Sequence, residues 1–303
     1  MVGWSKTADR AIRRMRMVGL FVPVCGCRIA LPLLASLVLA SAFTAPALAG
    51  PLEDAAAAAQ RGDFAGAAHL YQGLADHGDA NAQNGLGDLY YNGRGVPQDY
   101  ARALDLYRRA AEQGQIAAQN KLGPMYLHGR GTSPNFAEAL RWFRRAAALG
   151  FAGAQYSLGN MYFNGQGVDK DLLEAARWYS RAAEQGHAQA QFILALLYRE
   201  GAGVDVNPRK SAYWFERAAV QGHAEAQVEL GRMYAAGAGA PQDPVIAYKW
   251  LSLAKAGAPN GAVRANAARS LDLLAARMTP AQIGEAQRQA REWRAMPSKA
   301  NQS

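Results

Sequence analysis

An eleven-residue segment, LGDLYYNGRGV at 86–96, recurs in recognisable form four more times at a constant spacing of 36 residues. Its tyrosine falls at 90, 126, 162, 198 and 234, and a glutamine stands seven residues before it in each copy. Self-similarity at a fixed period of this length is typical of repeat architectures, in which each unit stacks on its neighbours. The sequence therefore predicts an array of five repeats over residues 79–257.

Each unit is predicted to form two helices. The first, about Ala80–Asn92 in the first copy, carries Leu86, Leu89 and Tyr90 at the spacing of one helical face. A glycine that is expected to end this helix in the left-handed conformation follows in every copy, at Gly93, Gly129, Gly165, Gly201 and Gly237. Asp or Asn stands where the second helix should begin, at Asp99, Asn135, Asp171, Asn207 and Asp243.

The second helices are predicted to bury a tryptophan column. Its members are Trp142, Trp178, Trp214 and Trp250, with Leu106 at the same position of the first copy. Alanine follows one turn later in all five copies, which lets neighbouring helices approach closely. We expect each tryptophan to fill the space beside those alanines, so that the hydrophobic cores of successive units join.

The paired glycines of the recurring loop, first seen at Gly93 and Gly95, have two interpretations. A glycine-rich loop before a helix binds phosphate in some enzymes, but that loop ends in Lys-Ser/Thr and follows a strand. This loop has neither feature, and it recurs in every unit, whereas one phosphate site would need it once. We interpret these residues as turn glycines.

The flanks of the array carry further predicted segments. Residues 50–78 keep the repeat phase and are predicted to be a truncated N-terminal repeat. Residues 258–296 are predicted to form two helices that cap the C-terminal end, because solenoids cover their exposed ends with polar terminal units. Residues 297–303 are expected to be a disordered tail.

Residues 1–49 are predicted to be a secretory signal peptide. Basic residues precede an apolar run that ends in Ala47-Leu48-Ala49, the small-residue pattern that a signal peptidase cleaves, here between Ala49 and Gly50. We therefore expect a periplasmic or secreted protein that keeps no stable membrane insertion. An uncleaved membrane anchor, which would make the chain a tethered spacer, stays open because the run is long enough to span a bilayer. Met1, Met15 and Met17 are alternative starts.

The composition excludes several classes of function. Cys25 and Cys27 both lie in the predicted signal peptide, so the mature chain would have no thiol for catalysis, redox chemistry or metal binding. Beyond residue 49 the chain holds 27 basic and 23 acidic residues, a balance that does not favour nucleic acid as a partner.

A column of arginines on the second helices could meet nucleic acid or acidic glycans. The preferred interpretation is a solvated face paired with Glu112 and Glu184; the column is Arg109, Arg145, Arg181 and Arg217.

The sequence offers no catalytic constellation. His187 and His223 occupy the same repeat position but lie a whole repeat apart with no third ligand in the column, so we interpret them as polar residues at helix starts. No Ser-His-Asp order, H-E-x-x-H spacing or converging pair of carboxylates is evident. We expect no enzymatic activity, no cofactor and no metal.

The pattern A-x-A-Q-x-x-L-G-x-x-Y-x-x-G-x-G-V, followed by D, A and W-x-x-x-A-A-x-x-G, resembles the Sel1-like repeat, a relative of the tetratricopeptide repeat. The resemblance covers residues 79–257. It implies a right-handed α/α solenoid, a TPR-like superhelix, with a non-catalytic role in assembling or regulating other proteins. Secreted bacterial relatives include periplasmic regulators of a sensor kinase that controls exopolysaccharide. Others are cysteine-rich forms that bind β-lactams, whose helix-linking cysteines this chain lacks.

In superhelices of this kind the first helices line the concave surface. First-helix positions that differ between the copies are therefore candidates for recognition, and aromatic side chains beside arginine are typical of binding hot spots. The alternative is that they pack between adjacent first helices. The candidates are Tyr91, Leu127, Tyr156, Asn160, Phe163, Phe192, Leu196, Arg199 and Arg232. We expect a monomeric exported scaffold or adaptor that binds an envelope protein or peptide, the alternative being a cell-wall or β-lactam-binding protein or enzyme.

Overall fold

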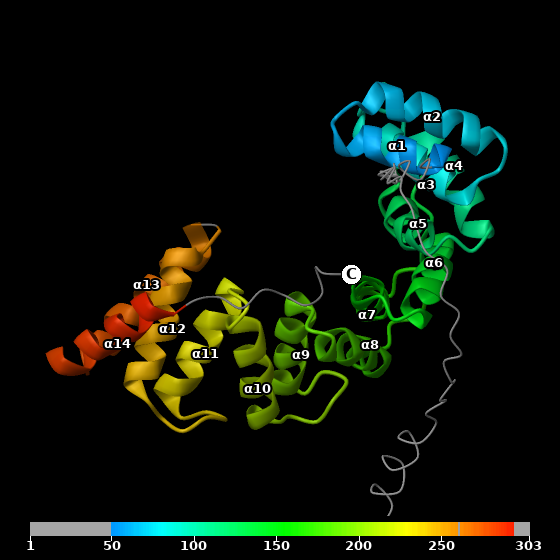
Figure 1. Cartoon of the computed structure of the whole chain (residues 1–303). Coiled ribbons are helices and arrows are strands. Elements are labelled where there is room, and N and C mark those ends of the chain that lie inside the picture. Colours follow the sequence, from blue (N-terminus) through cyan, green and yellow to red (C-terminus); the bar gives the residue numbers. More distant parts are fainter. Residues whose placement is uncertain (1–49, 260, 294–303) are drawn as a thin grey trace, which may run out of the picture. The chain divides into compact units, whose positions relative to one another are not determined.

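The computed structural model describes residues 50–259 and 261–293, which form fourteen helices and no strand (Figure 1). An N-terminal pair, α1 (Pro51–Gln60) and α2 (Phe64–Asp76), precedes the five repeats. The repeats are α3 (Ala80–Asn92) with α4 (Tyr100–Glu112), α5 (Ile116–His128) with α6 (Phe136–Ala148), α7 (Ala152–Asn164) with α8 (Leu172–Glu184), α9 (Ala188–Glu200) with α10 (Pro208–Ala219), and α11 (Ala224–Ala236) with α12 (Pro244–Gly257). Helices α13 (Gly261–Ala275) and α14 (Pro280–Glu292) follow.

Successive helices from α1 to α13 pack against one another along the chain, which is the packing of an α-solenoid. The predicted fold class is therefore confirmed. The predicted signal peptide and the tail at 297–303 lie outside the described residues. Among the helices that the structure describes, none combines the length and the apolar character needed to span a bilayer.

Local signals set the helix boundaries as predicted. Each first helix ends at a glycine with φ between 64° and 73°, and the first of these is Gly93 after α3. Each second helix begins after an Asp or Asn whose side chain accepts a hydrogen bond from a backbone N–H of the first turn. The backbone N–H of the same capping residue donates to the carbonyl oxygen of the repeat tyrosine, as Asp99 does to Tyr90 at 3.0 Å, and this closes the loop.

The two loop glycines have different roles. The first ends a helix, whereas the second lies against the beginning of the second helix of the preceding repeat. A Cβ atom on Gly131 would overlap the carbonyl oxygen of Tyr100, and one on Gly203 would overlap that of Leu172. The loop is therefore a turn, as predicted, and it is also a contact between repeats that excludes any side chain.

The expectation that every tryptophan of the column is buried is wrong for two of the four. Trp142 and Trp250 are 1% and 4% exposed, but Trp178 and Trp214 are only half-buried. The residue that follows each of these positions fills the core of every repeat instead. This buried column, which the sequence analysis did not identify, is Tyr107, Phe143, Tyr179, Phe215 and Leu251.

A glycine in the first helix makes room for this buried column. Gly87 lies against the ring of Tyr107, and Gly159 against that of Tyr179, so closely that a Cβ atom would clash with the ring. The glycine of the recurring Leu-Gly pair is thus explained by close packing of the two helices of one repeat. The repeat that carries Ala195 instead still buries Phe215.

Both flanks of the array are helical. The segment predicted as a truncated repeat forms the pair α1 and α2, of which α1, at ten residues, is shorter than the thirteen of α3. At the other end α12 packs against both α13 and α14. Helix α14 starts with a complete capping box between Thr279 and Gln282, and Trp293 meets Trp250 edge-on at 6.1 Å between ring centroids.

Candidate functional site

We call the nine candidate residues on α3, α5, α7, α9 and α11 the variable face. The structure places seven of them, including every aromatic one, in half-buried positions, and only Arg199 and Arg232 are exposed. The aromatic side chains are therefore less open than the sequence analysis expected. Each aromatic side chain presents part of its surface to solvent while the remainder packs against the repeats. Exposure for recognition and packing between first helices, the two interpretations of these residues, therefore each describe part of the arrangement.

Two of these aromatic side chains stack on histidines of the following repeat. Tyr156 in α7 lies 4.7 Å from the imidazole of His187, and Phe192 in α9 lies 4.7 Å from that of His223, with interplanar angles of 20° and 22°. Each histidine precedes the next first helix, so each stack joins two adjacent first helices. The aromatic rings are thereby held in one orientation before any partner arrives.

The same histidines are N-caps, as the sequence analysis preferred. Nδ1 of His187 accepts from the Ala190 N–H at 3.2 Å, and Nδ1 of His223 accepts from the Ala226 N–H at 3.3 Å. Burial lowers the pKa of both imidazoles, which favours the neutral form that a capping acceptor requires. The described part of the chain holds no group of three or more His, Cys, Asp or Glu side chains suited to a metal ion.

Hydroxyl groups of the buried column donate hydrogen bonds to polar side chains of the first helices, and one of these acceptors belongs to the variable face. The hydroxyl of Tyr179 donates to Asn160 Oδ1 at 2.7 Å, and burial raises the pKa of this tyrosine. In the first repeat the hydroxyl of Tyr107 donates to Asp88 at 2.6 Å, and Lys121 of the next repeat binds the same carboxylate at 2.6 and 2.8 Å. Lys121 was missed by sequence reasoning, although this position carries a different residue in every copy.

An ion-pair network occupies the other end of the variable face. Glu229 in α11 binds Arg199 of α9 at 2.8 Å and Arg232 of its own helix at 3.1 Å. Arg232 also donates to Asn266 of α13, and the Arg199 guanidinium lies 5.9 Å from the centre of the Phe215 ring. One carboxylate thus orients both predicted arginines while their side chains stay 39% and 42% exposed.

The variable face therefore changes character along the array. Its members on α3 and α5 are Tyr91 and Leu127, and the ion pair between Asp88 and Lys121 joins the same two helices; its members on α7 and α9 are mostly aromatic or aliphatic, and Glu229 holds the two arginines. Tyr91 and Leu127 pack against the hydrophobic clusters of their own repeats, and Lys170 lies 5.7 Å from the ring of Phe163. Fixed aromatic side chains next to oriented charges suit the binding of a polypeptide, because few groups need to be ordered on association.

The arginine column of the second helices is arranged differently from the prediction. Among the described residues, Arg109 and Arg181 do not form the expected ion pairs with Glu112 and Glu184. Instead, the guanidinium groups of Arg145 and Arg181 lie 4.9 and 4.4 Å from the ring centres of Trp142 and Trp178. Two members of the column thus lie over indole faces, whereas Arg217 lies 5.7 Å from the ring centre of Tyr213 and Arg109 donates to the carbonyl oxygen of Ala75.

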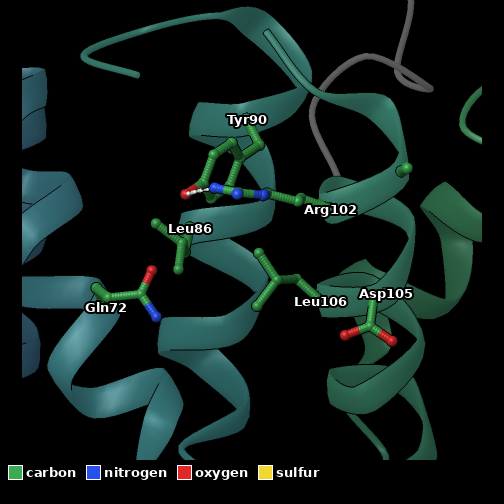
Figure 2. A pocket seen from close by; sticks show the side chains of 7 residues that line it. Gln72, Leu86, Tyr90, Arg102, Asp105 and Leu106 are labelled. Carbon is green, nitrogen blue, oxygen red and sulfur yellow. Dashed lines mark hydrogen bonds between the residues drawn. The ribbon is translucent and has the colours of Figure 1, made fainter. Parts of the chain in front are cut away.

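A hollow of about 480 Å³ lies between α2, α3 and α4 (Figure 2). Leu86 and Leu106 supply apolar walls, and Gln72 and Asp105 lie on opposite sides. At one end Arg102 donates to the hydroxyl of Tyr90 at 3.0 Å (Figure 2). The sequence analysis did not predict this hollow, although Leu106 already stood out in the tryptophan column.

Comparisons with known proteins agree with this geometry. The family described as Sel1 repeat matches the chain five times, at residues 80–115, 116–151, 152–187, 188–223 and 224–257. A Sel1 repeat protein from Oxalobacter formigenes is similar in structure, with a TM-score of 0.66 and 29% sequence identity over 82% of this chain and 100% of that one. A protective antigen of uropathogenic Escherichia coli, c5321, has a TM-score of 0.50 and 29% identity over 76% of this chain and 56% of its own. The comparison with curated proteins found no match.

Proposed function

The chain belongs to the Sel1 repeat family, and we propose that it is a scaffold that binds a partner protein or peptide along the variable face. Sel1 repeats mediate protein interactions, and proteins built from them are generally non-enzymatic. The proposal adds to this the place of contact, which is the concave groove expected for the first helices of such a solenoid.

One observation carries the proposal: half-buried aromatic side chains are fixed by stacking on the next repeat. Tyr156 and Phe192 repeat the same ring-on-imidazole contact one unit apart, which gives two equivalent anchor points on adjacent helices. Arg199, oriented by Glu229, lies 5.9 Å from the ring centre of Phe215, which is in turn 5.8 Å from the ring of Phe192. Aromatic and arginine side chains surrounded by packed neighbours are the usual composition of binding hot spots.

The predicted signal peptide supports a place for this function outside the cytoplasm. A basic segment, an apolar run and Ala47-Leu48-Ala49 support export with cleavage before Gly50. The partner would then be a protein or peptide of the cell envelope, and the chain would scaffold or regulate an envelope system such as signalling or exopolysaccharide production. We propose a monomer that uses no cofactor and does not bind nucleic acid.

Photo-crosslinking in cells tests the proposal. A photoreactive amino acid replaces Phe163 on the variable face, and a matched control carries it in place of Arg177, whose side chain is 63% exposed on α8. We expect one dominant protein adduct from position 163 that is absent from position 177. Phe192→Ala and Arg199→Ala, each checked for folding by circular dichroism, should remove that adduct. Adducts only within the chain itself would show that these side chains serve interior packing and would contradict the proposal.

A further inference from the structure

Leu106 stands where the other four repeats carry tryptophan. The clusters around Leu106 and Trp142 are equivalent one repeat apart. Trp142 packs with Tyr107, Leu122 and Met125, beside Tyr126. Leu106 packs with the residues 36 positions earlier in each case, which are Tyr71, Leu86, Leu89 and Tyr90. The residues around Leu106 are therefore equivalent to those around Trp142, but the first repeat has no indole side chain between them.

The smaller side chain leaves the hollow between α2, α3 and α4 (Figure 2). Leu106 is 7% exposed and lines the hollow together with Leu86, so an entering group would meet apolar side chains. Water against such surface is displaced favourably by an apolar group of matching size. The position of Leu106 shows what that size is, because an indole occupies the equivalent place in Trp142.

The cation that covers the indole elsewhere is also present here. Arg109 is the counterpart of Arg145 and Arg181, which lie 4.9 and 4.4 Å from the ring centres of Trp142 and Trp178. Lacking such a ring, Arg109 donates to the carbonyl oxygen of Ala75 at 3.2 Å and stays 4.0 Å from Asp105, with its side chain 43% exposed. Arg109 does not itself line the hollow, but it holds the repeat position from which Arg145 covers Trp142, so an aromatic guest in the place of that indole would meet its guanidinium and be attracted through the ring quadrupole.

Asp105 adds a selective group. It stands where the second repeat has Arg141, and it brings a carboxylate to the wall of the hollow. One of its oxygens accepts from Arg108 at 2.8 Å, and the other is 4.0 Å from Arg109, which leaves it able to accept a shorter hydrogen bond. The buried Nε1 atoms of Trp142 and Trp178 have no hydrogen-bond partner within the described chain. An indole entering the first repeat would gain the acceptor that those two lack.

We propose that this hollow binds a tryptophan side chain presented by a partner polypeptide, which takes the place left by Leu106. The inference rests on the proposed function, since it assumes a polypeptide partner, and it identifies a second contact with that partner on α2, α3 and α4. Apolar contact with Leu86 and Leu106, the guanidinium of Arg109 and the carboxylate of Asp105 together distinguish tryptophan from leucine.

A fluorine NMR titration of the full chain tests the inference. The probe is the blocked peptide Gly-Ser-(5-fluorotryptophan)-Ser-Gly, and the chain variants are Leu106→Trp, which fills the hollow from within, and Leu106→Met, which conserves its volume. We expect the wild type and Leu106→Met to shift the fluorine signal alike, and Leu106→Trp to bind at least about tenfold more weakly. Leu106→Trp should melt no lower than the wild type, because it restores the residue of the other repeats.

Arg109→Gln gives a second variant that leaves the hydrophobic core untouched. Loss of the cation should weaken binding by about two- to fivefold. A leucine version of the peptide should compete poorly with the fluorinated probe. Absence of a fluorine shift at millimolar wild-type protein, equal binding by Leu106→Trp, or equal competition by the leucine peptide would each overturn the inference.

Failure here is distinguishable from failure of the proposed function. If the fluorine titration is negative while Phe163 still yields its protein adduct, the variable face stands as a binding surface and the hollow does not. If the hollow binds the peptide and position 163 yields no adduct, the partner contacts the array at α2, α3 and α4 and the proposed contact along the variable face is wrong.

Discussion

The side-chain amide of Gln191 in α9 donates a 2.9 Å hydrogen bond to the carbonyl oxygen of Ala183, at the end of α8 in the preceding repeat. The last carbonyl groups of a helix have no partner within the helix, and this one also accepts from the backbone N–H of Gly186 at 3.0 Å, so the glutamine adds a second hydrogen bond from the next repeat. The Oε1 atom of Gln191 accepts from Gln221 at 2.7 Å. The glutamine column that marks the repeat therefore joins neighbouring units through buried hydrogen bonds.

Replacing this glutamine should loosen the array. Gln191→Leu removes both the side-chain donor to the Ala183 carbonyl oxygen and the acceptor of the Gln221 amide, and the glutamine is only 1% exposed, so we expect the free energy of unfolding to fall by about 1–3 kcal/mol. Urea denaturation followed by circular dichroism measures this loss. Gln119→Leu is the matched control, because Gln119 makes the same bond to Ala111 at 3.2 Å but is half-buried, and it should cost less. Equal losses would show that burial does not decide the effect.

Substitutions of two loop glycines distinguish the cost of backbone strain from the cost of disturbing a contact between repeats. Gly131 and Gly150 both have positive φ, 80° and 92°, so alanine is strained at either position. A Cβ atom on Gly150 would meet open space, whereas one on Gly131 would overlap the Tyr100 carbonyl oxygen of the preceding repeat. We expect Gly150→Ala to cost about 1–3 kcal/mol and Gly131→Ala clearly more, as measured by urea denaturation. Similar losses would mean that the loop adjusts without cost.

The tryptophan column should respond unequally to truncation. Trp142 is 1% exposed and Trp178 is half-buried beneath Arg181, so removal of the two indoles exposes different areas of the core. We expect Trp142→Ala to cost about 3–5 kcal/mol and Trp178→Ala appreciably less. Thermal and urea unfolding of both variants under one set of conditions provides the comparison. A loss for Trp178→Ala as large as that for Trp142→Ala would contradict the packing described here.

The features that were predictable from the sequence depend on neighbouring residues along the chain. The turn at Gly93 and the cap at Asp99 involve contacts within a few positions, so their residue types identify them without knowledge of the fold. Whether Trp178 or Tyr179 fills the core depends on contacts with another helix, which the neighbouring sequence does not reveal. Tyr179 is buried because Gly159, in the other helix of its repeat, leaves room for the ring.

The candidate site was predictable to a similar extent. Variation between the copies located the positions on the first helices, and His187 was placed at a helix start because its column precedes one. The stacking of Tyr156 on His187 depends on the distance between two repeats, which no periodicity within one repeat determines. The sequence shows that Leu106 replaces a tryptophan of the column. Whether this substitution leaves a hollow depends on which side chains surround that position in the fold.

The two histidine caps make the stability of the array depend on pH. Protonation of Nδ1 removes the acceptor that holds the first turn of α9 or α11, and burial of the imidazole away from water disfavours its charged form. The pKa of His187 and that of His223 are accordingly lowered in the folded state, while the nearby Glu225 only partly offsets this for His223. In the unfolded chain the pKa returns to about 6.5.

Below about pH 6.5 the unfolded chain therefore takes up protons that the folded chain resists, and the free energy of unfolding falls; above that pH the contribution is fully present. We expect urea midpoints of the wild type to drop between about pH 7.5 and about pH 5. A double variant, His187→Asn with His223→Asn, keeps a capping acceptor that does not titrate in this range and should lose less. The exposed His69, His77 and His128 are common to both proteins, so their effects cancel in the comparison. An equal drop in both proteins would show that other groups cause the pH dependence, because only the two caps differ.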